Sequence, residues 1–180
     1  MRAHRLVFLV AAVLAACGGG SAGSADSADY SHVMSFDSTR VRLVAKRDTF
    51  NLRLELALTE TQKQMGFMER TSLAEGSGML FVYDSTQASD AGFWMYRTRI
   101  PLDIAFLDSA GVIRSVRAMV PCTTDIPQGC KTYTPDVPYR HALEMSEGYF
   151  AKHGIGVGDS LVLGDLPASV QQSAATANQR

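Results

Sequence analysis

Asp103 and Glu144 are acidic residues in strongly apolar surroundings, since each stands between two apolar neighbours in a segment that reads as a strand. A carboxylate flanked by core residues must face water or find a partner, because burial of an unpaired charge is costly. Two carboxylates that share one cleft can act as general acid and base on a glycosidic bond. The pair therefore predicts either a hydrolytic centre or a polar pocket.

Arg70, Trp94 and Arg97 could complete such a pocket. The arginines can neutralise a carboxylate, and an aromatic side chain beside arginines is typical of a ligand-binding surface. The candidate binding residues are thus Arg70, Trp94, Arg97, Asp103 and Glu144. Two plainer interpretations stay open: an internal salt bridge that serves the fold alone, and ordinary exposure to solvent. No catalytic residue is assigned.

Methionine sulfur is the second source of chemistry, because thioethers bind Cu(I) and six methionines lie in the central part of the chain. They are Met65, Met68, Met79, Met95, Met119 and Met145, and His141 and His153 could assist them. Most stand beside Phe and Leu, as flexible core residues do. Copper binding is therefore an alternative hypothesis, and no metal ligand is assigned.

Cys122 and Cys130 are separated by seven residues rich in turn formers. In an oxidising compartment such a pair is usually a disulfide, and we expect one here. Free thiols and a metal or redox role stay open as alternatives, although the spacing is not the Cys-x-x-Cys of a dithiol oxidoreductase.

The sequence lacks the motifs that are typical of several activities. No Gly-x-Ser-x-Gly elbow is present, and the glycines at 154–158 lead into a strand, which is the wrong context for a phosphate-binding loop. Lys+Arg 17 against Asp+Glu 18 gives a net charge of −1, so no nucleic-acid partner is expected. We expect no cofactor, and a monomer.

The N-terminus has the pattern of an export signal: Arg2 and Arg5 precede an apolar run that is too short to span a bilayer. Its end, Leu14-Ala15-Ala16-Cys17, resembles a bacterial lipobox. The resemblance implies cleavage before Cys17 and a lipid on its sulfur. A plain secretory signal is the alternative.

The predicted organisation has four parts. Residues 1–16 are the signal, 17–38 a lipidated cysteine and flexible Gly/Ser tether, 39–164 one folded domain, and 165–180 a disordered tail. The protein would face the periplasm. Gly18 after the cysteine favours the outer membrane in a Gram-negative cell.

Alternating apolar and polar residues predict strands at 41–45, 51–58, 78–83, 93–97, 102–108, 111–120, 139–145 and 159–163. Leu52, Leu54, Leu56 and Leu58 would share one face. Two short helices are expected at 59–70 and 146–154, the first capped by Thr59 with Gln62 and the second by Ser146. Asp108 to Gly111 should form a hairpin turn.

This order of elements lacks an alternating βαβ pattern. It predicts a mostly β (α+β) fold, a compact single-domain β-barrel or folded antiparallel sheet with two short helices.

Four motifs follow one another in the middle of the chain: Gly66-Phe67-Met68, Gly78-Met79-Leu80-Phe81, Phe93-Trp94-Met95-Tyr96-Arg97-Thr98 and Ile100-Pro101-Leu102-Asp103-Ile104. Leu143-Glu144, Gly148, His153-Gly154-Ile155 and Val157-Gly158-Asp159 come later. With these motifs the chain from Met65 to about Leu163 resembles the family called domain of unknown function 192. Tyr96-Arg97 stands where that family usually has Lys-Asn.

The resemblance implies a small, mostly β domain and supplies no catalytic residues. The leading interpretation is a membrane-anchored envelope lipoprotein that binds a small molecule or an envelope partner. The alternatives are an envelope hydrolase that uses Asp103 and Glu144, and a Cu(I)-binding protein.

Overall fold

The computed structural model of the chain describes residues 35–171. Its elements are β1 (Ser38–Val44), β2 (Thr49–Ala57), α1 (Glu60–Met65), β3 (Ser77–Gln87), β4 (Phe93–Trp94), β5 (Leu102–Leu107), β6 (Ile113–Met119), β7 (Thr132–Tyr133), β8 (Tyr139–Ser146), α2 (Tyr149–Lys152) and β9 (Ser160–Leu161). Short 3-10 turns lie at Pro127–Gly129 and Leu163–Asp165.

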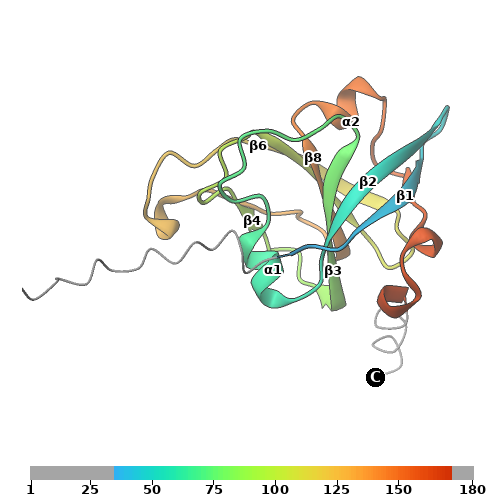
Figure 1. The fold of residues 1–180 in the computed structure, drawn as a ribbon, viewed down its shortest axis with the longest axis horizontal. Helices are drawn as coiled ribbons and strands as arrows, with labels where there is room; N and C mark the ends of the chain where they lie inside the picture. The colour runs from blue at the N-terminus through green and yellow to red at the C-terminus, as the bar shows by residue number, and fades with distance from the viewer. Residues whose placement is uncertain (1–34, 172–180) are drawn as a thin grey trace, which may run out of the picture. The chain divides into compact units, whose positions relative to one another are not determined.

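Seven strands form one sheet in the order β6-β5-β8-β3-β2-β1-β9, which curls into a half-barrel (Figure 1). Neighbouring strands are antiparallel except β2 and β3, which are parallel and are joined through α1. β4 and β7 make a separate two-stranded ribbon. The expectation of a mostly β domain with short helices is confirmed.

Period-two alternation produces the strands at the β1–β2 side of the sheet. Leu52, Leu54 and Leu56 of β2 are fully buried, whereas Arg53 between them is exposed. Leu58 was expected to continue this face, but β2 ends at Ala57 and Leu58 is an exposed residue before α1. The capping requirement of the helix therefore ends the strand one residue earlier than the pattern suggests.

The two central strands, β5 and β8, are buried along almost their whole length on both faces of the sheet. Each face therefore carries its own apolar cluster. The first-face cluster includes Leu54, Leu80, Ala105, Leu143 and Met145. The second-face cluster includes Met79, Phe81, Ile104, Phe106 and Ala142.

Different segments cover the two faces. Tyr149 and Phe150 of α2 pack into the first-face cluster. Phe67, from the turn after α1, and Tyr133 of the β4–β7 ribbon pack into the second-face cluster. The second cover is irregular chain with only short elements, and this is the cover that encloses the candidate site.

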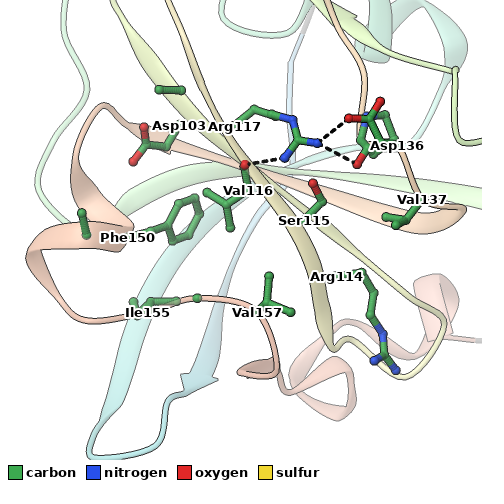
Figure 2. A pocket seen from close by; sticks show the side chains of 14 residues that line it. Asp103, Arg114, Ser115, Val116, Arg117, Asp136, Val137, Phe150, Ile155 and Val157 are labelled. Atoms are coloured by element: carbon green, nitrogen blue, oxygen red, sulfur yellow. Dashed lines mark hydrogen bonds and ion pairs between the residues drawn. The ribbon is translucent and has the colours of Figure 1, made fainter.

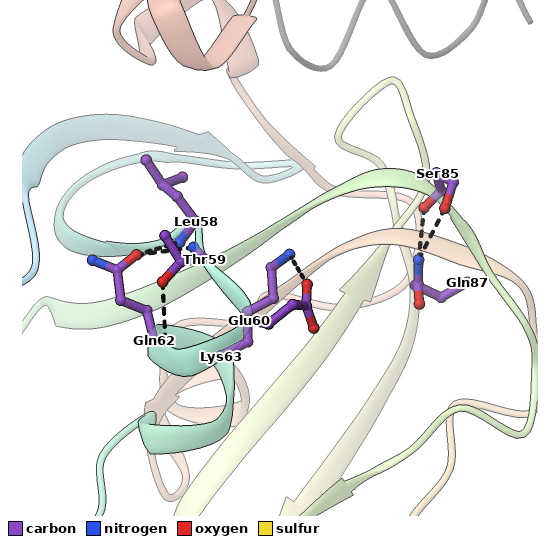
Figure 3. A network of polar contacts seen from close by, with 7 residues as sticks. All are labelled: Leu58, Thr59, Glu60, Gln62, Lys63, Ser85 and Gln87. Atoms are coloured by element: carbon purple, nitrogen blue, oxygen red, sulfur yellow. Dashed lines mark hydrogen bonds and ion pairs between the residues drawn. The ribbon is translucent and has the colours of Figure 1, made fainter.

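Local capping signals account for α1 and for the β5–β6 turn. The Thr59 hydroxyl accepts from the Gln62 backbone N–H, and the Gln62 side chain accepts from the Thr59 N–H, so the expected capping box is confirmed (Figure 3). In the β5–β6 turn, Gly111 has φ 82° and donates to the Asp108 carbonyl. Only glycine adopts that conformation easily.

The second helix begins differently from its expected start. Ser146 is the last residue of β8, and Gly148 is the N-cap of α2 without a side-chain cap of its own. The acceptor comes from another strand, because the Asp103 carboxylate accepts from the N–H groups of Gly148 and Phe150. The cap is thus supplied by tertiary contact, which a local sequence pattern does not contain.

Cys122 and Cys130 form the expected disulfide, with their Cα atoms 5.5 Å apart. It closes the segment that leads from β6 into β7, and Cys122 itself packs against the second-face cluster. β7 was not expected from the sequence. Within residues 35–171 its two residues pair with β4. In residues 35–171, no helix is long and apolar enough to cross a membrane.

Two residues of the segment expected to be a disordered tail lie in the core. Leu166 and Val170 are 5% and 6% exposed and belong to the first-face cluster. Asp165 pairs with Arg42 at 2.8 Å, and this arginine lowers the pKa of Asp165 to about 2. The domain therefore reaches at least Gln171, and 172–180 lie outside the described residues.

We predict that a chain ending at Gly164 is less stable than one ending at Gln171. Removal of Leu166 and Val170 from the core should lower the free energy of unfolding by about 3–6 kcal/mol, since each buried aliphatic side chain contributes about 1.5–3 kcal/mol. Urea denaturation midpoints of the two truncated chains test this. Equal midpoints would mean that the segment contributes nothing to the core.

Candidate functional site

Glu144 is the most unusual polar residue of the second face. It lies in the middle of β8, opposite Met79 of β3 and Ile104 of β5, and is 4% exposed. Within residues 35–171, nothing donates a hydrogen bond to its carboxyl group or forms an ion pair with it. Burial alone raises its pKa to about 8, so at neutral pH the group is mostly protonated and can both donate and accept a hydrogen bond.

A small cavity of about 20 Å³ lies against Glu144, enough for one water molecule. Polar and apolar groups contribute about equally to the surface of its wall, and four of the lining residues are aromatic. Eleven residues line it: Lys63, Gln64, Met65, Gly66, Phe67, Met68, Phe81, Phe93, Trp94, Thr98 and Glu144. We call this space the Glu144 cavity.

The wall residues differ in exposure in a way that gives the cavity a closed and an open side. Phe67, Phe81 and Thr98 are buried together with Glu144, whereas Trp94 is 42% exposed. The Phe81 and Phe93 rings meet edge to face with centroids 4.9 Å apart. The cavity therefore lies beneath the surface at Trp94, with the carboxyl group among its buried lining.

The capped helix holds one wall in place. Lys63, on α1, donates to Glu60 at 2.9 Å (Figure 3). Its Nζ also lies 4.6 Å from the centre of the Tyr83 ring. Gly66 ends the helix with φ 46° and donates to the Gln62 carbonyl. That turn directs Phe67 into the second-face cluster, so the end of α1 is fixed at both its cap and its core contact.

Met68 and Thr98, which line the cavity, are each followed or preceded by a residue in the left-handed region. These two residues, Glu69 and Arg97, are called the rim of the cavity. Glu69 has φ 62° and Arg97 has φ 54°, and the Glu69 N–H donates to the Arg97 carbonyl at 2.8 Å. The Arg97 Nε is also 2.8 Å from the Glu69 carboxylate, which bonds Arg99 as well. Non-glycine residues in this conformation cost about 1–2 kcal/mol each, and such strain concentrates at functional sites.

The arginines predicted for the pocket neutralise other carboxylates. Arg70 donates to both oxygens of Glu55 at 2.6 Å, and Arg97 pairs with Glu69. Arg70 and Arg97 thus hold the surroundings of the cavity and do not compensate Glu144. Of the five candidate residues, the structure brings Trp94 and Glu144 together in the cavity wall.

Asp103 lies on the opposite face of the sheet. Asp103 is opposite Met145 in the β5–β8 register, and Ile104 is opposite Glu144. Because paired residues share a face and successive residues alternate, the two carboxylates point away from each other. The predicted single pocket is therefore wrong in this respect, and the two groups cannot act together on one bond.

Asp103 instead lines a shallow groove of about 620 Å³ along the edge strand β6 (Figure 2). The charged groups there already have partners. Arg117 bonds the carbonyls of Val116 and Pro135 and the Asp136 carboxylate, and Asp103 holds the start of α2. Burial raises the pKa of Asp103, and its two backbone hydrogen bonds oppose that shift.

The methionines divide between core and cavity. Met79, Met95, Met119 and Met145 are fully buried in the two clusters. Met65 and Met68 are half-buried and line the Glu144 cavity. Neither His141 nor His153 lines it, and residues 35–171 contain no group of three His, Cys, Asp or Glu arranged to hold a metal.

Sequence reasoning missed the rest of the cavity wall as a site. Lys63 and Gln64 gave only a helical signal, and Met65 and Met68 were considered only as thioether ligands. The remaining missed residues stand in motifs that carry the family resemblance, and those motifs were the usable signal: Gly66, Phe67, Phe81, Phe93 and Thr98. Motif residues far apart in the chain thus meet around one carboxyl group.

We predict that Glu144→Gln changes the pH dependence of stability. The folded chain keeps the Glu144 proton up to about pH 8, whereas the unfolded chain loses it near pH 4.3. The unfolded state therefore binds fewer protons in between, and the wild type should lose about 2 kcal/mol of unfolding free energy from pH 6.5 to 9. Glutamine keeps the shape and does not titrate, so the variant should lose much less.

Urea titrations at several pH values measure this difference. The range starts at pH 6.5 because burial lowers the pKa of His141 to about 4, and that group reduces stability only as the pH falls below 6.5. Parallel wild-type and variant profiles would show that Glu144 is ionised in the folded chain.

Comparisons with known proteins support the mostly β fold. No curated protein matches the chain. A crystal structure of a "putative transcription regulator" from Sinorhizobium meliloti 1021 is 32% identical, with a TM-score of 0.64, over 71% of this chain and 95% of that one. A protein of unknown function from Novosphingobium aromaticivorans DSM 12444 is 28% identical, with a TM-score of 0.61, over 72% of this chain and 87% of that one.

The family model of DUF192, described as an uncharacterized ACR, matches residues 42–163. This span is more than half of the 180 residues and contains every residue that lines the Glu144 cavity. The chain belongs to the DUF192 family, the domain of unknown function 192.

Proposed function

We propose that this protein is an exported lipoprotein whose DUF192 domain binds a small ligand, or the end of a larger one, in the Glu144 cavity. The observation that carries the proposal is a buried carboxyl group with no partner in the described chain. Such a group lowers stability, and polar groups of this kind are typical of binding sites.

The composition of the wall supports binding in preference to catalysis. A ligand site is mostly apolar with a few placed polar groups, and Glu144 and Thr98 are such groups among aromatic rings. A hydrolase that uses Asp103 with Glu144 would need both carboxylates on one face, and they lie on opposite faces. A copper site would have Met65 and Met68 as its thioether donors.

The regulatory description of the Sinorhizobium protein is not extended to this chain. A DNA-binding domain usually carries a clear basic excess, and this chain has a net charge of −1. The lipobox-like end at Cys17 and the export signal before it favour the periplasmic side of a membrane.

Membrane attachment through Cys17 is tested by Cys17→Ser. The wild-type chain, expressed in a Gram-negative host, should sediment with the membranes, and the variant should appear in the soluble periplasmic fraction or stay unprocessed. Two or three acyl chains anchor firmly, whereas the serine variant has none. Equal distribution of the two chains, with the variant cleaved to the same length as the wild type, would contradict lipidation.

Binding in the cavity is tested by native mass spectrometry. The full chain, purified in detergent and incubated with the small-molecule fraction of a bacterial periplasm, should carry an organic adduct. Trp94→Ala and Glu144→Gln should weaken the adduct at least about tenfold, the effect of roughly 1.4 kcal/mol.

Glu75→Gln is the matched control, because it removes an exposed carboxylate that pairs with Lys152 and does not line the cavity. It should keep the adduct. An adduct that survives in both cavity variants, or no adduct in any chain, would contradict the proposal. A copper-sized mass that is lost on Met65→Leu would favour the metal site.

A further inference from the structure

We propose that the group recognised in the Glu144 cavity is the ammonium end of a primary amine, with Glu144 as its counter-ion and the rings of Phe67, Phe81, Phe93 and Trp94 as its walls. The inference rests on the proposed binding function and names the chemical class of the ligand.

Size limits the group that can enter. About 20 Å³ accommodates a single water-sized group, and an –NH3⁺ head is of that size. A phosphate, a carboxylate, a sugar ring or a trimethylammonium head is larger. The ligand would therefore place one small polar end inside while the rest of the molecule stays outside, next to the exposed Trp94.

Electrostatics favour a cation over a neutral polar group. The faces of aromatic rings attract cations, most strongly those of tryptophan, and the cavity is lined by four rings. Glu144 adds a carboxyl group that can become a carboxylate and accept hydrogen bonds from the ammonium. Rings together with a carboxyl group make this lining suited to an amine and unsuited to an anion.

The cations of the chain near the cavity have partners elsewhere. Lys63 lines the wall, but its Nζ bonds Glu60 and lies over the Tyr83 ring. Arg70 is held by both oxygens of Glu55. A counter-ion for Glu144 would therefore have to come from outside the described residues.

A cation other than an amine fits less well. Met65 and Met68 offer two thioethers to a soft metal, but a carboxylate is a hard ligand that such metals disfavour. No histidine or cysteine lines the wall. Four of the eleven lining residues are aromatic, and their rings do not serve as metal ligands.

Binding should release a proton. Before binding at pH 7, Glu144 is mostly protonated. In the complex an adjacent ammonium stabilises the carboxylate, so protonated Glu144 and R–NH3⁺ give the ion pair and one proton that passes to the buffer. The other titratable or charged groups near this region are Tyr83 of β3, Tyr139 of β8, and Glu60 and Lys63 of α1. Glu69 and Arg97 at the rim pair with each other, and Arg140, earlier on β8, is buried with contacts of its own.

The chain offers a site-specific readout, because Trp94 is its single tryptophan. The experiment titrates the full chain in detergent with n-butylammonium, with n-butanol of equal length and no charge, and with tetramethylammonium as the oversized cation. Tryptophan fluorescence reports binding. Calorimetry at pH 7 in phosphate and in MOPS, whose ionisation enthalpies differ and which contain no primary amine, reports the protons released.

We expect n-butylammonium to bind at least about tenfold more tightly than n-butanol, a ratio of the size that cation–π and ion-pair contacts give. Proton release should be about 0.9 per site at pH 7 and approach zero above pH 9. Glu144→Gln should remove the preference for the amine and the proton release, and Glu75→Gln should keep both. Tetramethylammonium should leave the fluorescence unchanged.

Other results would overturn the amine assignment in distinguishable ways. Equal binding of n-butanol and n-butylammonium would leave the binding function standing and exclude the ammonium class. If the chain carries a periplasmic adduct but its fluorescence changes with none of the three probes, the binding function would stand and the ammonium class would be excluded. No adduct and no probe response would contradict both proposals, and stoichiometric Ag(I) binding that is lost on Met65→Leu would assign the cavity to a soft metal.

Discussion

A sheet whose central strands are buried on both faces must be covered twice, and this constraint organises the whole domain. β5 and β8 have almost no exposed residue. One cover is supplied by α2 and the packed segment around Leu166, and the other by the turn after α1 and the β4–β7 ribbon. The second cover consists of irregular chain and short elements. The Glu144 cavity lies beneath this cover.

The position of Glu144 in this arrangement is costly for folding. An apolar residue at that position would contribute to the second-face cluster, whereas the carboxyl group keeps its proton at neutral pH because burial opposes ionisation. Asp103 shows what a structural carboxylate does in the same sheet, since it accepts two backbone hydrogen bonds and starts a helix. Glu144 has no comparable structural task among the described contacts. A residue that lowers the stability of the fold and has no structural role is typically retained because the function requires it.

Much of the fold could be predicted from the sequence because its signals are local. Leu52, Leu54 and Leu56 alternate with polar residues, Thr59 and Gln62 stand at capping-box spacing, and Gly111 marks a tight turn; the structure has all three features. The failures are non-local. Ser146 had the residue type of a helix cap, but the acceptor comes from Asp103, more than forty residues earlier.

The candidate site was predictable only in part for the same reason. Trp94 and Glu144 were chosen by residue type, and both line the cavity. Asp103 was grouped with them because its sequence surroundings are similar, but the side of the sheet on which a residue lies depends on the parity of its position in the strand and on the register between strands. The β5–β8 register joins segments about forty residues apart, and no local pattern encodes it. Tertiary pairing therefore decides which acidic residues can work together.

The rim explains why an irregular cover can still form a defined site. Glu69 and Arg97 both adopt left-handed conformations, and a backbone hydrogen bond and an ion pair join them. Strained residues persist only where surrounding contacts over-determine them, so these bonds hold the segments before β3 and after β4 in one arrangement. The capping box fixes the neighbouring end of α1 in the same way. A cavity held by such contacts exists before a ligand arrives, and a preorganised site loses less conformational entropy on binding. On the proposed binding function, the strain at the rim and the unpaired carboxyl group beneath it are two parts of one device, in which folding free energy is given up so that a small charged group can be bound selectively.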